Sequence, residues 1–165
     1  ILGNHDYAHN WNYPEVADQL VKRLAELGIR TLRNEFHLLD GLQLVGLDDL
    51  WGPNFKPETV LSQVNWNEAT LTLCHNPDAV DLPALSVCKG WVLSGHTHGG
   101  QCKPPFLAPP LLPVKNRRYT SGEFDLGNGR WLYINPGLGY LHRVRFNVRP
   151  EISIFRLRKA MSPPS

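Results

Sequence analysis

Cysteine is scarce in this sequence of 165 residues: Cys74, Cys88 and Cys102 are the only three, and no two of them form a CxxC pair. An odd number of widely spaced cysteines argues against a disulfide framework and against a structural zinc site of the cysteine type. The same scarcity is typical of a protein from a reducing compartment, so we expect free thiols.

Long apolar runs and an excess of either charge are also absent. A membrane-spanning helix needs about 20 apolar residues, and the apolar stretch Pro104–Val114 is too short and contains five prolines. The formal net charge of +2 gives no reason to predict nucleic-acid binding. With 42% hydrophobic and 19% charged residues, the composition predicts one soluble globular domain. We place this domain at residues 1–160 and expect a disordered tail at residues 161–165.

The sequence opens on ILGNHD, a motif-like segment with no preceding leader. We therefore expect these residues to come from a longer protein, whose own N-terminus and any targeting signal lie upstream. The expected location is the cytoplasm or the inner surface of the cytoplasmic membrane.

Hydrophobic patterning predicts a layered α/β domain. Apolar residues at helical spacing predict a helix over Pro14–Gly28. The runs Thr31–Leu39 and Leu42–Leu47 flank Asp40-Gly41, which is a strong signal for a β-hairpin. Shorter signals predict helices over Pro57–Val64 and Asp78–Leu85, and strands ending at Leu2 and spanning Ala69–Cys74, Trp91–Ser94, Arg118–Leu126, Arg130–Asn135, Arg143–Val148 and Glu151–Arg158.

Three short segments place histidine or asparagine directly after an expected strand: Gly3–Asp6, Cys74–Pro77 and Gly95–Gly100. Ligands in open α/β sheets bind beyond the strand ends, so we expect these three loops to converge. Imidazole nitrogens with an amide oxygen suit Mn, Fe, Zn, Ni or Co, whereas a calcium site would need more carboxylates. Core or hairpin packing is expected for four tryptophans, Trp51, Trp66, Trp91 and Trp131.

The segments GNHD, a histidine followed by Asn-Pro, and GHTHGGQ resemble the calcineurin-like metallophosphoesterases. The segments LVGLDDLW, LLPVKNRRYTSG, INPGLG and RFNVRPEI resemble in particular the bacterial YaeI/YkuE-like phosphodiesterase branch, and that branch is similar to UDP-diacylglucosamine pyrophosphatases. The resemblance covers nearly the whole chain. It implies a four-layer α/β/β/α sandwich that holds two divalent metal ions, for which manganese is favoured.

The resemblance also implies roles for individual residues. Asn4, His75 and His96 would bind one metal ion, and His98 would bind the other. His5 would lie beside the scissile phosphate and assist the leaving oxygen. Asp6 would orient His5, although an Asp in a loop also commonly caps backbone donors.

The family normally supplies an Asp-x-His pair and a Gly-Asp motif before GNHD, and this sequence contains neither. We therefore expect the sandwich to lack its first strands and the metal ligands that they carry. Asp48 and Asp49 belong to LDDL, which lies where this branch normally has it, so they do not replace those ligands.

A further candidate region is the proline-rich loop and the cations after it, Lys115, Arg117 and Arg118. A solvated face is the simpler interpretation. Alternatively, Phe106, Leu107, Leu111 and Leu112 contact a bilayer or acyl chains while the cations contact phosphates.

The function implied by the resemblance is hydrolysis of a phosphodiester or pyrophosphate bond by a hydroxide activated between two metals, with a lipid-linked substrate and peripheral membrane contact expected. Two alternatives remain open at this point. One is an incomplete fragment that retains partial metal binding, and the other is a membrane-surface binding module.

Overall fold

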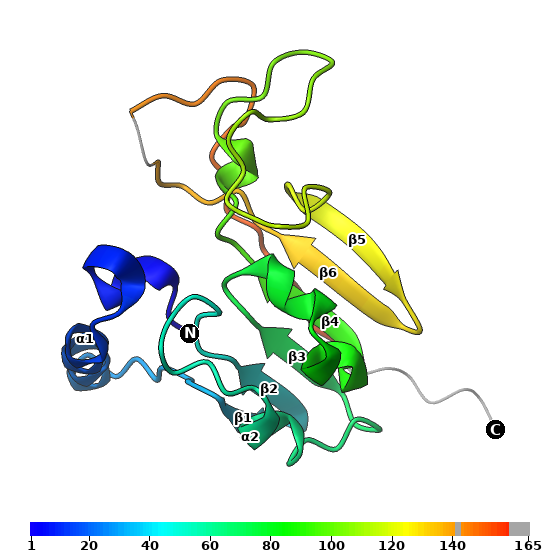
Figure 1. Ribbon diagram of the computed structural model, residues 1–165. Helices are drawn as coiled ribbons and strands as arrows, with labels where there is room; N and C mark the ends of the chain where they lie inside the picture. Colours follow the sequence, from blue (N-terminus) through cyan, green and yellow to red (C-terminus); the bar gives the residue numbers. More distant parts are fainter. Residues whose placement is uncertain (141–142, 159–165) are drawn as a thin grey trace.

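The computed structural model describes residues 1–140 and 143–158, so the predicted disordered tail at residues 161–165 lies outside the described residues. The described chain is a mixed α/β structure with one six-stranded sheet in the order β1-β2-β3-β4-β6-β5 (Figure 1). The α/β class predicted from the sequence is confirmed. No helix within the described ranges is long and apolar enough to cross a membrane.

The six strands are short and alternate with helices and turns along the chain. They are β1 (Glu35–Leu39), β2 (Leu42–Gly46), β3 (Thr70–Leu73), β4 (Gly90–Ser94), β5 (Gly122–Gly127) and β6 (Arg130–Ile134). The helices are α1 (Pro14–Glu26) and α2 (Glu58–Leu61), with 3-10 helices η1 (Asn4–Tyr7), η2 (His9–Trp11), η3 (Pro77–Asp81), η4 (Pro83–Val87) and η5 (His98–Gly100).

The predicted hairpin is confirmed, with β1 antiparallel to β2 and Leu39 opposite Leu42. Asp40 and Gly41 both have positive φ, 49° and 87°, as the two central residues of a type I′ turn require. Strand β1 begins at Glu35, four residues after the predicted start at Thr31.

Strands β2, β3, β4 and β6 are parallel, so their carboxyl ends meet at one edge of the sheet. On one face, Val45, Thr72, Val92 and Leu132 lie in register across these strands and are at most 1% exposed. They form the main core with α2, η3 and η4. On the opposite face, a second row in register is only partly covered: Leu44, Leu71, Trp91 and Trp131.

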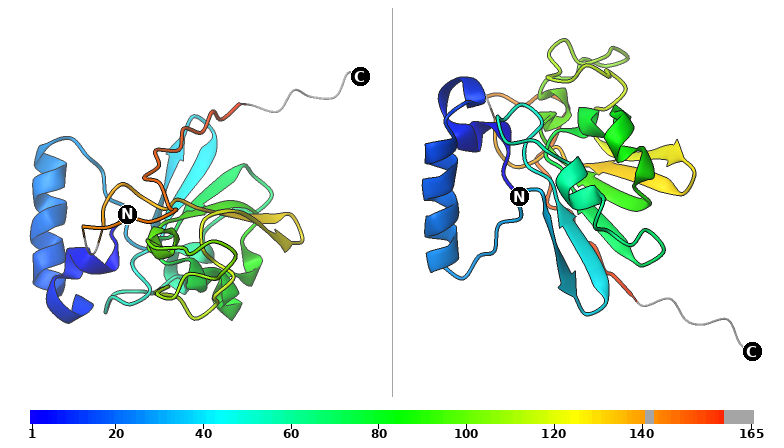
Figure 2. Two further views of the ribbon diagram at one scale, coloured as in Figure 1. Left: turned by 90° about the horizontal axis from the view of Figure 1, so that it is seen from above. Right: turned by 60° about the horizontal axis from the view of Figure 1, so that its bottom comes forward.

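Helix α1 lies away from the sheet beside the N-terminal segment (Figures 1 and 2). It packs through Ala17 against Leu2 and Tyr7, which form a second, smaller core. Pro14 begins the helix and Gly28, with φ of 76°, lies just after its end, so this predicted helix is confirmed.

Several sequence predictions are wrong in detail. Residues 78–85 form two 3-10 turns instead of one helix, because Pro83 lacks the backbone N–H that a continuous helix needs. The predicted strands over residues 1–2, 143–148 and 151–158 are absent from the described structure. In the second of these segments, Phe146 forms only an isolated bridge to Cys102. Alternation of apolar residues stabilises a strand only where a neighbour accepts its hydrogen bonds.

Candidate metal centre

The structure brings together the three loops that the sequence singled out. Asn4 begins η1, His75 follows β3 and His96 follows β4. Because β3 and β4 are adjacent and parallel, the two histidines leave the same edge of the sheet. The N-terminal segment then places Asn4, which is 2% exposed, against both of them.

Three ligand-type atoms form a nearly equilateral triangle. Asn4 Oδ1 lies 3.2 Å from His75 Nε2 and 3.2 Å from His96 Nδ1, and the two nitrogens are 3.3 Å apart. Bonds of about 2.0–2.2 Å to a single ion would separate neighbouring ligand atoms by roughly 3.0–3.5 Å. The triangle therefore has the dimensions of one face of a metal coordination sphere.

The tautomer of His96 is fixed by the loop above it. His96 Nε2 lies 2.8 Å from the carbonyl oxygen of Pro113, which can only accept a hydrogen bond. Nε2 therefore carries the proton, and Nδ1 presents its lone pair to the triangle. Asn4 Oδ1 is also an acceptor, so these two atoms face each other with no proton between them.

The two facing acceptors, Asn4 Oδ1 and His96 Nδ1, show that the site fits a cation. A divalent ion between Asn4, His75 and His96 would pair lone pairs that otherwise repel. Three ligands are few for a metal ion, however. Among the described residues there is no group of three or more histidine, cysteine, aspartate or glutamate side chains suited to a metal, so further ligands would be needed for a closed sphere.

The other proposed site residues lie around the same cavity. His98 lines it, and Nδ1 of His98 is buried without a hydrogen-bond partner among the described residues. His5 also lines the cavity and is exposed to solvent. Asp6 Oδ2 accepts a hydrogen bond from the backbone N–H of Gly3 at 2.8 Å, which is the capping arrangement considered from the sequence.

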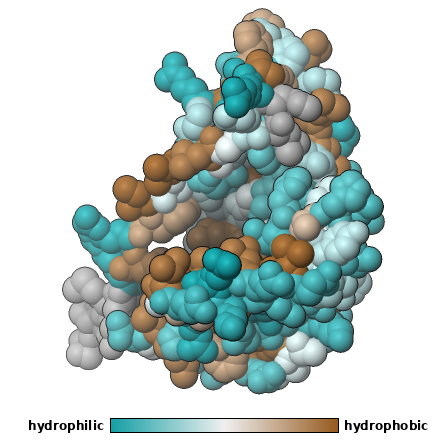
Figure 3. Space-filling view, turned by 90° about the vertical axis from the view of Figure 1, so that its left-hand side faces the viewer, coloured by the Kyte–Doolittle hydropathy of each residue, from teal (hydrophilic) through white to brown (hydrophobic). Residues whose placement is uncertain are grey.

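The cavity has a volume of about 420 Å³ and an aromatic wall that sequence reasoning missed. Trp51 packs edge-on against His96 with ring centroids 4.4 Å apart, and Trp11 lies on Trp51 at 4.6 Å. The sequence suggested only core or hairpin packing for Trp51. Figure 3 looks onto this side of the molecule and shows that it is hollowed, with hydrophobic residues along the hollow.

The backbone conformation of the site lets its side chains lie close together. A Cβ on Gly3 would lie 2.9 Å from the His75 ring, so only glycine leaves room for that ring beside Asn4. His96 and His98 have φ of 67° and 52°, in the left-handed region that non-glycine residues rarely adopt. Such strained residues persist only where the surrounding structure holds them in place, and they are common at functional sites.

Arg145 was also missed from the sequence, since its role depends on long-range contacts. Its guanidinium donates hydrogen bonds to the carbonyl oxygens of Pro136 at 2.9 Å and His98 at 3.5 Å, and to that of Gly139. It therefore ties the loop after β6 to the His98 loop. Burial, followed by the positive charge of Arg145, lowers the pKa of His98.

The candidate cations do not line this cavity. Arg117 donates a hydrogen bond to the carbonyl oxygen of Pro109 at 2.7 Å, and Arg118 lies over the rings of Tyr119 and Phe124. Lys115 is exposed. Arg117 thus braces the proline-rich loop, whereas Arg118 packs on the start of strand β5.

A buried carboxylate holds the loop that orients His96. Asp78 is 7% exposed and accepts hydrogen bonds from the backbone N–H groups of Lys115 at 2.7 Å and Asn116 at 3.0 Å. These residues directly follow Pro113 and Val114. Asp78 thereby positions the Pro113 carbonyl that fixes the tautomer of His96.

Asp78→Asn is expected to lower the affinity for Mn²⁺ by about 10-fold, as losses of groups that orient ligands usually do. The asparagine offers one acceptor oxygen where two amides need one each, so the Pro113 loop loosens. Isothermal titration calorimetry measures the change. Asp125→Asn, at an exposed position of strand β5, is the control, and equal losses in both variants would contradict the positioning role.

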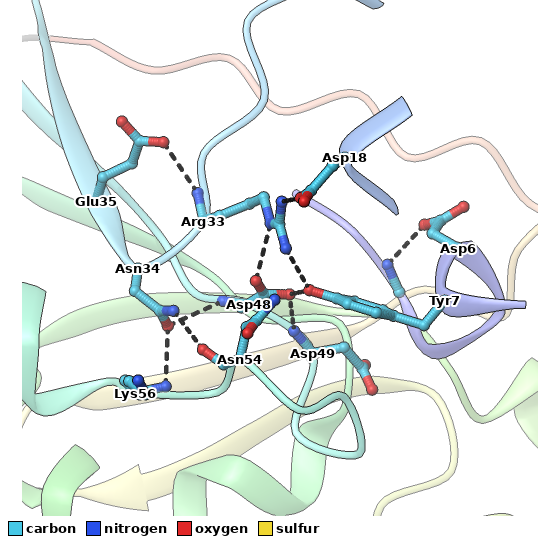
Figure 4. A network of polar contacts seen from close by, with 11 residues as sticks. Asp6, Tyr7, Asp18, Arg33, Asn34, Glu35, Asp48, Asp49, Asn54 and Lys56 are labelled. Carbon is cyan, nitrogen blue, oxygen red and sulfur yellow. Dashed lines mark hydrogen bonds and ion pairs between the residues drawn. The ribbon is translucent and has the colours of Figure 1, made fainter. Parts of the chain in front are cut away.

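A second polar network anchors the N-terminal segment (Figure 4). The Tyr7 hydroxyl donates to Asp48 Oδ1 at 2.5 Å, and Arg33 donates to Asp48 Oδ2 at 2.9 Å and to the Tyr7 oxygen at 2.8 Å. Burial and the bond to Asp48 raise the pKa of Tyr7 to about 12. Tyr7 is three residues from Asn4, so this network fixes the turn that presents Asn4.

Both triangle histidines are neutral near pH 7. Burial, together with the neighbouring histidines, lowers the pKa of His75 to about 3. Burial lowers the pKa of His96 to about 4, against the opposing effects of the Pro113 carbonyl and Asp78. Asp49 behaves in the opposite way, since burial raises the pKa of its carboxyl to about 6.

In EDTA, the free energy of unfolding is expected to fall by roughly 2–3 kcal/mol between pH 6.5 and pH 4.5. Each histidine with a lowered folded-state pKa destabilises the folded state by about 1.4 kcal/mol per pH unit below the unfolded value, whereas Asp49, with its raised pKa, offsets one of the two. Urea denaturation at several pH values measures the slope. His75→Asn should nearly abolish it and Asp49→Asn should steepen it, and unchanged slopes would contradict the assignment.

The chain is similar in sequence to several known proteins. The chain is 32% identical to phosphodiesterase YaeI of Escherichia coli over 94% of its length and 56% of that protein. It is 34% identical to the uncharacterized metallophosphoesterase YkuE of Bacillus subtilis, over 96% of the chain and 55% of the relative. It is 30% identical to UDP-2,3-diacylglucosamine pyrophosphatase LpxG of Chlamydia trachomatis, over 92% of the chain and 48% of the relative.

No family model and no solved structure matches the chain. The chain spans about half the length of the curated relatives that it matches. These relatives match the chain at 30–34% identity over more than nine-tenths of its length, and they are named phosphodiesterase, metallophosphoesterase and pyrophosphatase. The chain therefore belongs to the metallophosphoesterase family of the YaeI and YkuE type.

Proposed function

We propose that this chain supplies part of the active site of a metal-dependent phosphoesterase that hydrolyses a phosphodiester or pyrophosphate bond. The observation that carries the proposal is the triangle of Asn4 Oδ1, His75 Nε2 and His96 Nδ1, whose sides are 3.2–3.3 Å. The relatives support the reaction class, since they are named phosphodiesterase, metallophosphoesterase and pyrophosphatase.

In this proposal Asn4, His75 and His96 hold one divalent ion, with manganese favoured, and His98 holds a second. Bound divalent ions would neutralise phosphoryl oxygens and make water acidic enough to attack at neutral pH. His5, exposed at the cavity wall, holds a proton for the leaving oxygen. Asp6 supports His5 by fixing the turn through the Gly3 amide.

Three ligand atoms leave coordination positions open, so we propose that carboxylates from beyond these residues complete the centre. The length of the relatives, about twice that of the chain, supports this. A four-layer sandwich would place a second sheet on the partly covered apolar face of Leu44, Leu71, Trp91 and Trp131. This row in register is the support for that fold.

A lipid-linked pyrophosphate is one proposed substrate, because the LpxG relatives are named UDP-2,3-diacylglucosamine pyrophosphatases. Peripheral membrane contact is proposed for the proline-rich loop, in which Phe106, Leu107 and Leu111 are 64% or more exposed. Leu112 is only 9% exposed, so it would not take part in such a contact.

The test is manganese-dependent hydrolysis of bis(p-nitrophenyl) phosphate by the 165-residue chain and by the full-length product of its reading frame. Turnover by the full-length product is expected, with a loss of about a hundredfold or more in His98→Ala. His37→Ala, on strand β1 away from the cavity, is the control and should retain activity.

If neither protein turns over with Mn, Fe, Zn, Ni or Co, the hydrolase proposal fails. If the full-length product is inert but both proteins bind Mn²⁺, the fragment with partial metal binding becomes the better description. Lipid binding that persists in a His96→Ala/His98→Ala variant would instead favour the membrane-surface module.

A further inference from the structure

A second cavity of about 420 Å³ adjoins the metal centre. It lies between the His98 segment and the proline-rich loop, and it shares His98 and Pro113 with the first cavity. A molecule whose phosphate lies at the metal centre could therefore extend directly into this second space.

The walls of the second cavity are mainly apolar. The loop contributes Pro110, Leu111 and Leu112, and Val144 also lines the cavity. Pockets of this size and composition take up apolar groups, because transfer of such groups from water is favourable. Their specificity comes from a few polar groups, here Thr97 and Gln101 together with His98, which both cavities share.

The cavity is held open by specific contacts. The loop lies so close to Gly100 that a Cβ there would be 2.2 Å from Pro109. Arg117 holds the carbonyl of Pro109, and the buried Leu112 anchors the end of the loop. The space beneath the loop is thus part of the fold, and an incoming ligand need not create it.

We propose that this second cavity binds the apolar chain of a phosphoester whose phosphate lies at the metal centre. Only one part of this inference rests on the proposed function: the placement of the ligand's phosphate at the metal centre. The selected substrate class is an alkyl- or acyl-bearing phosphoester, in which the apolar chain is linked close to the hydrolysed phosphate.

Cys102 provides a reporter that does not depend on catalysis. It lines the second cavity and is partly exposed, whereas Cys74 and Cys88 are at most 2% exposed. Burial also raises the pKa of both buried thiols, that of Cys88 to about 11, so they react slowly. Modification by N-ethylmaleimide therefore reports access to Cys102.

The experiment measures how methyl, butyl, hexyl and octyl phosphate slow the modification of Cys102 in the Mn²⁺-loaded chain. All four share one phosphate, so differences report the chain alone. Protection is expected at concentrations that fall by about fourfold for each methylene that enters the cavity, as for apolar groups leaving water. Equal protection by all four, or none by octyl phosphate, would overturn the proposal.

Two matched variants locate the effect. Leu111→Ser changes a residue that lines the cavity, and Leu107→Ser makes the same change at an exposed residue of the same loop outside it. Leu111→Ser should weaken protection by octyl phosphate three- to tenfold and leave that by methyl phosphate unchanged. If Leu107→Ser has the same effect, the chain binds the loop surface and the proposal is wrong.

Failure of the apolar subsite can be distinguished from failure of the proposed hydrolase function. If bis(p-nitrophenyl) phosphate is not hydrolysed but protection still depends on chain length, the subsite stands and the hydrolase proposal falls. If hydrolysis occurs and all four phosphates inhibit it equally, the hydrolase proposal stands and the subsite falls.

Discussion

Replacing Asn4 by leucine is expected to lower the affinity for Mn²⁺ by about a hundredfold or more, whereas replacing it by aspartate retains or raises the affinity. Leucine has a similar size but no oxygen for the triangle with His75 and His96. Aspartate keeps the oxygen and adds a negative charge next to two neutral imidazoles. Isothermal titration calorimetry after removal of bound metal measures both variants.

The same triangle predicts which substitutions of the histidines preserve binding. The side-chain oxygen of asparagine can replace Nδ1 of a histidine, and that of glutamine can reach the position of Nε2. His96 contributes Nδ1 and His75 contributes Nε2. Partial affinity is therefore expected in His96→Asn and His75→Gln, and none in His96→Gln and His75→Asn.

Asn67→Leu, at an exposed position, controls for general effects of the substitution. Thermal unfolding in EDTA shows whether each variant is folded before metal is added. A folded Asn4→Leu variant that binds Mn²⁺ like the wild type would reduce Asn4 to a turn residue. The triangle would then be a coincidence of packing.

Local signals in the sequence predicted the elements that position this triangle. Asp40-Gly41 predicted a hairpin because few residues adopt positive φ, and Pro14 and Gly28 marked the ends of α1. The short apolar runs before His75 and His96 predicted two strands, and parallel pairing placed both histidines at one edge. Each of these predictions depends on neighbours in the sequence.

The errors occur where a residue's role depends on distant parts of the chain. Glu151–Arg158 alternates like a strand, yet Ile152 and Ile154 are 73% and 91% exposed because the described structure gives them no neighbour. Tryptophan is a residue type usually expected in a core, and only the fold reveals the contact of Trp51 with His96. Arg145 likewise has no local signal for its contact with the His98 loop.

Arg33→Met is expected to destabilise the chain by about 3 kcal/mol, the lower end for breaking one side of a buried ion pair, because Asp48 is buried whereas the Arg33 side chain is 18% exposed. Asp48 is 1% exposed and would retain only the Tyr7 hydroxyl and the Asp49 backbone amide as hydrogen-bond donors. Urea denaturation at pH 7 in EDTA measures the change. Asp18→Asn removes the exposed partner of Arg33 and should change stability by less than about 1 kcal/mol.

A double-variant cycle separates the charge from the shape of the network. Asp48→Asn removes the charge, so the Arg33→Met/Asp48→Asn variant should recover most of the stability that Arg33→Met loses. Losses that simply add would indicate that Arg33 acts by packing, without coupling to Asp48.

The network also has a functional readout, because it holds Tyr7 three residues from Asn4. A turn that is less firmly held presents the Asn4 oxygen less accurately, so Arg33→Met should bind Mn²⁺ about 10-fold more weakly even where it remains folded. Asp18→Asn should bind as the wild type does. If Arg33→Met loses stability but no affinity, the two cores are energetically independent, and the His75 and His96 loops alone position Asn4.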